Sequence, residues 1–117
     1  MATMMPIHLT TSLTAFSEAR ADKVGRAREA EPHFEEQMRL ASDLMQQDPL
    51  RVDHRYSLSE AHENLGRVAA LQRRQDRARA QLNEALKIYQ GLAERNAISA
   101  EYAHVPDRIR KEMAELK

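Results

Sequence analysis

The chain has 117 residues, no cysteine, and eighteen basic residues against eighteen acidic ones. One small domain is the expectation at this length, and the lack of cysteine excludes disulfide frameworks, thiol catalysis and cysteine-ligated metals. A net charge of zero argues against a nucleic-acid binder, because that class usually carries a basic excess. The strong helix formers Ala, Leu, Glu, Gln, Lys, Arg and Met make up more than half of the chain, whereas Val, Ile and Thr are few. This composition predicts an all-α protein.

The first ten residues combine a proline with scattered apolar side chains. They contain no basic region and no long apolar run, so we expect neither a signal peptide nor a membrane span, and a cytoplasmic protein. We interpret residues 1–10 as a flexible N-terminal tail. The alternative is an apolar arm that covers an exposed helix face, either in the same chain or in a homodimer.

A first helix pair is predicted over residues 11–47. Thr11 or Ser12 can cap the first helix, and Gly25 is a natural stop because glycine adopts left-handed geometry without a Cβ penalty. The second helix is expected from Arg28 to Gln47, with Pro32 in its first turn, where the missing N–H has no intrahelical partner. Its apolar face has helical spacing: Ala30, Phe34, Met38, Ala41, Leu44 and Met45.

A second helix pair is predicted over residues 53–95, after the Asp48-Pro49 stop. Its helices cover about 53–73 and 76–95, and the short turn between them requires an antiparallel pair. A final helix is expected within residues 99–117, with Pro106 at the start of its firmer part.

The two pairs share an internal repeat. When the sequence is shifted by the distance along the chain from Ala30 to Ala78, one series of mostly apolar residues aligns with another. Ala30, Phe34, Met38, Leu40, Leu44 and Asp48 correspond to Ala78, Leu82, Leu86, Ile88, Leu92 and Asn96. A period in this range is typical of stacked helical repeats.

Residues 59–92 resemble the tetratricopeptide repeat (TPR). Leu65, Gly66, Ala78, Leu82 and Ala85 stand at positions 7, 8, 20, 24 and 27 of the repeat unit that starts at Ser59. The glycine allows a close approach of the paired helices, and the alanines are small where helices cross. Gln90 replaces the usual proline and Arg73 a common glycine. The long spacing resembles arrays of bacterial signalling and regulatory proteins. The resemblance implies a short right-handed solenoid of about five helices, with residues 99–117 as the capping helix.

No catalytic constellation is recognisable. His62-Glu63 begins like a zinc-protease helix, but Gly66 stands where the second histidine would be. Glu101 and His104 form one Glu-x-x-His, whereas a di-iron bundle needs two such motifs and two more glutamates. We therefore expect a non-enzyme with no cofactor and no metal, and hold a small helical enzyme or metal protein as a remote alternative.

An arginine-rich turn follows near residue 73. Its members, on both sides of the turn, are Arg67, Arg73, Arg74, Arg77 and Arg79. We interpret it as a solvated turn and consider contact with a phosphate or an acidic partner as the alternative. No Trp or Phe lies beside the cluster on which bases could stack, so RNA binding is not expected.

The resemblance places Glu60, Glu63, Asn64 and Arg67 on the concave face that binds partners. It implies a scaffold module that binds a peptide or helix of another protein, with neither nucleic acid nor membrane as partner. On this view, Arg67→Glu should weaken binding at a nearly unchanged melting temperature. The alternative is a structural domain that dimerises a larger regulator and has no peptide groove, motivated by the thin core.

Overall fold

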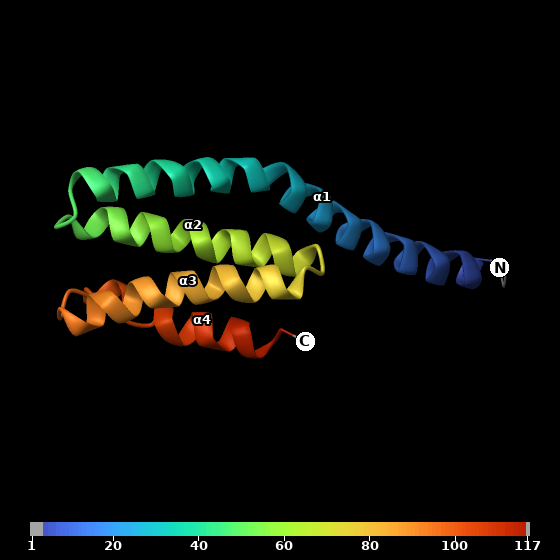
Figure 1. The fold of residues 1–117 in the computed structure, drawn as a ribbon. Helices are drawn as coiled ribbons and strands as arrows, with labels where there is room; N and C mark the ends of the chain where they lie inside the picture. Colours follow the sequence, from blue (N-terminus) through green and yellow to red (C-terminus); the bar gives the residue numbers. More distant parts are fainter. Residues whose placement is uncertain (1–3, 117) are drawn as a thin grey trace.

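The structure is a computed structural model that describes residues 4–116, with the side chains of residues 23–116. Within that range the chain forms α1 (Met4–Gln47), α2 (Val52–Leu71), α3 (Gln75–Glu94) and α4 (Val105–Ala114), and a short 3-10 helix, η1 (Ala100–Tyr102), precedes α4 (Figure 1). Residues 4–116 contain no strand. The predicted all-α class is confirmed, with four α-helices in this part of the chain where about five helices were expected.

The break predicted at Gly25 is wrong, because α1 runs through it without interruption. Thus the expected helices 11–24 and 28–47 are one helix, and it begins at Met4 rather than at Thr11 or Ser12; residues 1–3 of the predicted tail lie outside the described residues. A glycine inside a helix costs only about 1 kcal/mol relative to alanine, which the surrounding helix formers tolerate.

Pro32 was expected in a first turn and instead lies inside α1. It cannot donate a hydrogen bond to the carbonyl of Arg28, four residues earlier, and its ring crowds that carbonyl. Figure 1 shows α1 changing direction near this point and its N-terminal half extending past the turn between α2 and α3.

Short turns make the helices antiparallel neighbours. α1 ends at Gln47, as predicted from Asp48-Pro49, and the amide of Arg51 closes the turn by donating to the carbonyl of Asp48 at 3.2 Å. The turn between α2 and α3 covers residues 72–74. α2 therefore packs between α1 and α3, and α4 packs on α3 (Figure 1).

α2 and α3 approach each other closely at Gly66. A Cβ on Gly66 would lie 2.8 Å from Leu82 Cγ and 3.3 Å from the carbonyl oxygen of Ala78. The predicted close approach at Gly66 is confirmed. Ala78 and Ala85 are fully buried, as expected for small residues at a helix crossing.

α4 completes the core at the other end of α3. Val105 and Ile109 pack against a buried group from α3 that includes Leu82, Leu86 and Tyr89. Pro106 occupies the first turn of α4, as predicted. None of the helices in the described residues is long and apolar enough to cross a membrane.

The first copy of the repeat is less well covered than the second. Leu44, which was predicted to face inward, is 43% exposed, whereas its counterpart Leu92 is 1% exposed. Phe34 and Met38 are half-buried, although their counterparts Leu82 and Leu86 are buried. In the described part of the chain, α3 packs against both α2 and α4, whereas α1 packs mainly against α2.

Candidate functional site

The four residues predicted to bind a partner line one hollow. Glu60, Glu63, Asn64 and Arg67 all come from α2, at spacings that place them on one helix face. The hollow has a volume of about 230 Å³ and is closed on its other sides by α3, η1 and α4. The structure therefore brings the predicted residues together, against a wall formed by residues far along the chain.

Glu63 is the fixed centre of this site. Its side chain is only 4% exposed, and it receives two hydrogen bonds from Arg108 at 2.8 and 3.0 Å and one from Arg67 at 2.7 Å. A buried carboxylate needs such partners because desolvation of an unpaired charge is costly. The hydrogen bond to Glu63 raises the pKa of Arg108, so this guanidinium stays charged. Glu63 therefore holds α4 against α2 through these hydrogen bonds.

Arg67 is engaged in the same network. Besides Glu63, it contacts Glu112 of α4 at 2.7 Å. The change Arg67→Glu would put a third carboxylate between two others, and like charges at this distance repel. The expectation that this variant keeps its melting temperature is therefore replaced by the expectation of a lower one.

Three tyrosines build the far wall of the hollow. The rings of Tyr56 and Tyr102 stack with centroids 4.0 Å apart, and Tyr89 lies 5.9 Å from Tyr56. The Tyr56 hydroxyl donates to the carbonyl of Ala97 at 3.1 Å and accepts from the amide of Ser99 at 3.0 Å. Tyr56 thereby ties the segment after α3 to α2 and fixes the position of η1.

Burial changes the chemistry of these phenols. It raises the pKa of Tyr89 to about 12, with the nearby charge of Glu63 acting in the same direction and a hydrogen bond to Ser59 acting against it. Burial also raises the pKa of Tyr102, and Glu101 and Glu60 add to the effect. Both phenols therefore stay neutral at physiological pH. Tyr89 is buried, whereas the partly exposed Tyr102 presents its ring and hydroxyl to the hollow.

The polar side chains left for a partner are those on the rim. Neither Glu60 nor Asn64 makes a side-chain hydrogen bond or ion pair with any residue among 23–116. Sequence reasoning missed Tyr102, Glu101 and His104 as neighbours of these residues. Tyr56 and Glu60 are four residues apart on α2, so helical spacing could have placed the tyrosine on the same face as Glu60. In contrast, no local sequence pattern shows that η1 lies against this face of α2.

The motifs considered for metal binding do not form a metal site. His62 faces α3, where its Nδ1 lies 2.7 Å from Oε1 of Gln81. Glu101 and His104 line the hollow. Within the side chains that the structure describes, no three metal-ligating residues come together.

The arginine-rich turn is partly neutralised. Arg77 pairs with Glu31 at 3.3 Å and Glu35 at 3.5 Å, which links α3 to α1. Together with the ion pairs of Arg67, this leaves the turn less basic than the sequence indicates.

Comparison with known proteins found no match to this chain among protein-family models, curated proteins or solved structures.

Proposed function

We propose that the chain is a TPR-like interaction module, a short right-handed solenoid that binds a polar or charged segment of another protein in the hollow between α2 and α4. The observation that carries the proposal is the convergence of Glu60, Glu63, Asn64 and Arg67 on this hollow. Glu63 and Arg67 fix its floor through ion pairs, and Glu60 and Asn64 on the rim are free to bind.

The tyrosine wall supports the same proposal. A partially exposed aromatic face beside carboxylates suits a peptide with a cationic or amide side chain, because the ring adds contact area and a favourable quadrupole. The module acts without catalysis, metal or cofactor. In keeping with the long-period form of the repeat, we place it in a cytoplasmic bacterial signalling or regulatory protein.

A peptide-selection experiment tests this proposal. A displayed peptide library is selected on the purified chain, and the affinity of each selected peptide is measured for the wild type, Glu60→Lys and Glu94→Lys. Glu94 is exposed at the C-terminal end of α3 and does not line the hollow, so its variant makes the same charge change outside the hollow. We expect Glu60→Lys to weaken binding at least about tenfold, which is about 1.4 kcal/mol, at an unchanged melting temperature. Equal affinities for both variants, or no selected peptide, would refute the proposal.

A further inference from the structure

A further hollow, with a volume of about 500 Å³, lies where the C-terminal end of α4 meets the turn between α2 and α3. Its apolar lining comes from Ala70, Leu71, Leu82 and Leu116, and Leu71 is 45% exposed. The volume lies within the range of about 300–1,000 Å³ that is typical of ligand-binding hollows. This hollow is therefore large enough to take an apolar side chain of another molecule.

Two hydrogen-bond acceptors of the lining residues have no partner. Oε2 of Glu112 and Oε1 of Gln75 are buried, and neither receives a hydrogen bond within the part of the chain that the structure describes. Buried polar atoms are usually hydrogen-bonded, because desolvation without a partner is costly. After a rotation of either side chain, an N–H group placed in the hollow can supply the missing hydrogen bond. The hollow therefore favours an occupant that carries N–H donors next to an apolar group.

The charge of the lining points to a cation. Glu115 lines the hollow, is exposed, and forms no ion pair with any residue among 23–116. Arg67 also lines the hollow, but its guanidinium is already bound by Glu63 and Glu112. A lysine or arginine of a partner complements this lining, because it can pair with Glu115 and donate to the free oxygen of Glu112.

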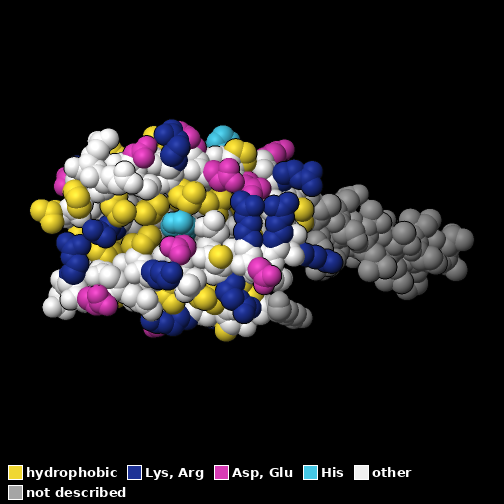
Figure 2. Space-filling view, viewed as in Figure 1, with side chains coloured by type: hydrophobic (Ala, Val, Ile, Leu, Met, Phe, Trp, Pro, Cys, Tyr) yellow, Lys and Arg dark blue, Asp and Glu magenta, His cyan; other side chains and the backbone are white. Residues whose placement is uncertain are grey.

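The turn beside the hollow carries the opposite charge. Figure 2 shows Lys and Arg side chains gathered near the turn between α2 and α3. Arg73 and Arg74 of this turn are exposed, and neither lines the hollow. Because these arginines repel a cation, the basic residue of an occupant lies toward α4, away from the turn.

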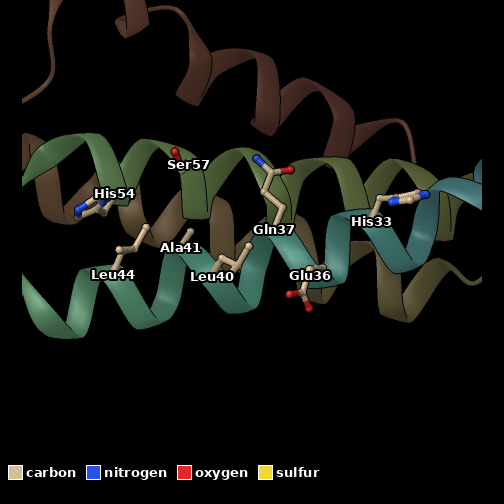
Figure 3. A pocket seen from close by; sticks show the side chains of 8 residues that line it. All are labelled: His33, Glu36, Gln37, Leu40, Ala41, Leu44, His54 and Ser57. Atoms are coloured by element: carbon tan, nitrogen blue, oxygen red, sulfur yellow. The ribbon is translucent and has the colours of Figure 1, made fainter.

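The hollow between α1 and α2 offers a comparison. It has a volume of about 370 Å³, and Figure 3 shows Leu40 and Leu44 of α1 beside it, with His54 and Ser57 of α2. Leu40 is 48% exposed, close to the value for Leu71. The structure describes all of its lining side chains, and none of them has a buried polar atom without a partner. It therefore provides apolar area without unpaired acceptors, which makes Leu40 a matched control position.

We propose that the hollow between α2, α3 and α4 binds a short segment of another protein, in which a large apolar side chain stands next to a lysine or arginine. The apolar side chain packs against Leu71 and Leu116, and the cation lies beside Glu112 and Glu115. This site does not rest on the proposed peptide site, whose hollow shares only Arg67 with it.

A selection with displayed peptides tests this site. A random peptide library is first depleted on the Leu71→Ser variant, which removes peptides that bind elsewhere, and the remainder is selected on the wild type. We expect the recovered peptides to combine a large apolar residue with a neighbouring lysine or arginine. Their affinity should fall at least about tenfold for Leu71→Ser and about threefold for Glu115→Lys. It should stay unchanged for the matched controls Leu40→Ser and Glu94→Lys.

Failure of this site is distinguishable from failure of the peptide site between α2 and α4. Peptides that bind at the latter also bind the Leu71→Ser variant and are depleted, so Glu60→Lys should leave the recovered peptides unaffected. The proposal would be overturned by recovery of no peptide, by peptides without a basic residue, or by peptides that Leu40→Ser weakens equally.

A second variant and a direct measurement cover the case in which Leu71→Ser disturbs the fold. Ala70→Phe fills the hollow rather than removing an apolar contact, and it should also abolish binding. NMR spectra of the leucine methyl groups locate the bound peptide on the wild type. The signals of Leu71, Leu82 and Leu116 should shift on binding, and that of Leu40 should not. A shift at Leu40 alone would place the peptide between α1 and α2 and contradict the assigned site.

Discussion

Arg108 of α4 donates two hydrogen bonds to the carboxylate of Glu63 on α2, at 2.8 and 3.0 Å, although the two residues are 45 positions apart. Because the Glu63 side chain is 4% exposed, the pair fixes the last helix by satisfying a charge that water cannot reach. The apolar contact of α4 with α3 supplies burial, and this ion pair sets the position of α4 relative to α2.

The first prediction follows from this pair. Arg108→Ala leaves one carboxylate oxygen of Glu63 without its partner, so the free energy of unfolding should fall by about 1–3 kcal/mol. Arg110→Ala is the matched control on the same helix, since its partner Asp107 is 86% exposed, and it should cost at most about 0.5 kcal/mol. Urea denaturation measures both, and equal losses would contradict the structural role of Arg108.

Gly66 gives a second prediction about the contact of α2 with α3. Alanine would favour the helix by about 1 kcal/mol, but its Cβ would lie 2.8 Å from Leu82 Cγ, and Leu82 is buried. We expect Gly66→Ala to destabilise by about 1–3 kcal/mol through overpacking. Nothing lies within 4 Å of a Cβ on Gly91, so Gly91→Ala should be neutral or stabilising. A stable Gly66→Ala variant would show that the helices are further apart.

The helix boundaries show which parts of the fold could be predicted from the sequence. The helix ends near Gln47 and Leu71 and the start of α3 are predictable because Pro49 and the short turn at residues 72–74 act locally. The interior of α1 is not predictable in the same way. Gly25 is a local signal for a helix end and Pro32 for a helix start, and the longer helical segments on either side outweigh both signals. Propensity gives the local preference, and only the whole helix decides whether a break forms.

The αL conformation of Arg73 is the basis of a third prediction. Arg73 follows α2 with a φ of 60°, and its amide donates to the carbonyl of Ala70 at 3.0 Å. A side chain in this conformation costs about 1–2 kcal/mol, which glycine avoids. Arg73→Gly should therefore raise the free energy of unfolding by about 0.5–1 kcal/mol, after the entropy that glycine gains in the unfolded chain. Arg74→Gly, at a φ of −97°, is the control and should be destabilising.

The candidate site was predictable on one side only. Helical spacing places Glu60, Glu63, Asn64 and Arg67 on one face of α2, and in the structure all four line one hollow. Spacing alone could not show that Glu63 is buried, because burial depends on Arg108 and α4 arriving from far along the chain. Long-range ion pairs of this kind have no signature in a local sequence pattern.

Ala78 gives a fourth prediction, on the crossing of α2 and α3. It is fully buried, and its carbonyl oxygen lies near Gly66, so there is no room for a larger side chain. We expect Ala78→Leu to lower the free energy of unfolding by about 1–3 kcal/mol. Ala80, two residues later on α3, is exposed, and Ala80→Leu should change the free energy of unfolding by less than about 0.5 kcal/mol. Thermal melts of the two variants decide the point, and the reverse order of stabilities would contradict the assigned crossing.

Tyr89 gives a fifth prediction, on stability in alkali. Its pKa is raised to about 12 in the folded protein, whereas an unfolded tyrosine loses its proton near pH 10. Below pH 10 both states keep the proton, so this group adds no pH dependence. Between pH 10 and 12 only the unfolded state loses it, and the free energy of unfolding should fall by about 1.4 kcal/mol per pH unit. Above the pKa of the folded protein both states have lost the proton, and this group lowers the free energy of unfolding no further.

Tyr89→Phe isolates this effect, because phenylalanine has no proton to lose. The variant should be somewhat less stable at pH 7, where it lacks the hydrogen bond to Ser59. Its free energy of unfolding should nevertheless fall less steeply than that of the wild type between pH 10 and 12. Guanidinium unfolding of both proteins at pH 9 and pH 11 measures the difference, in which lysine and arginine titration cancels. Parallel losses in the two proteins would mean that burial does not hold the Tyr89 proton.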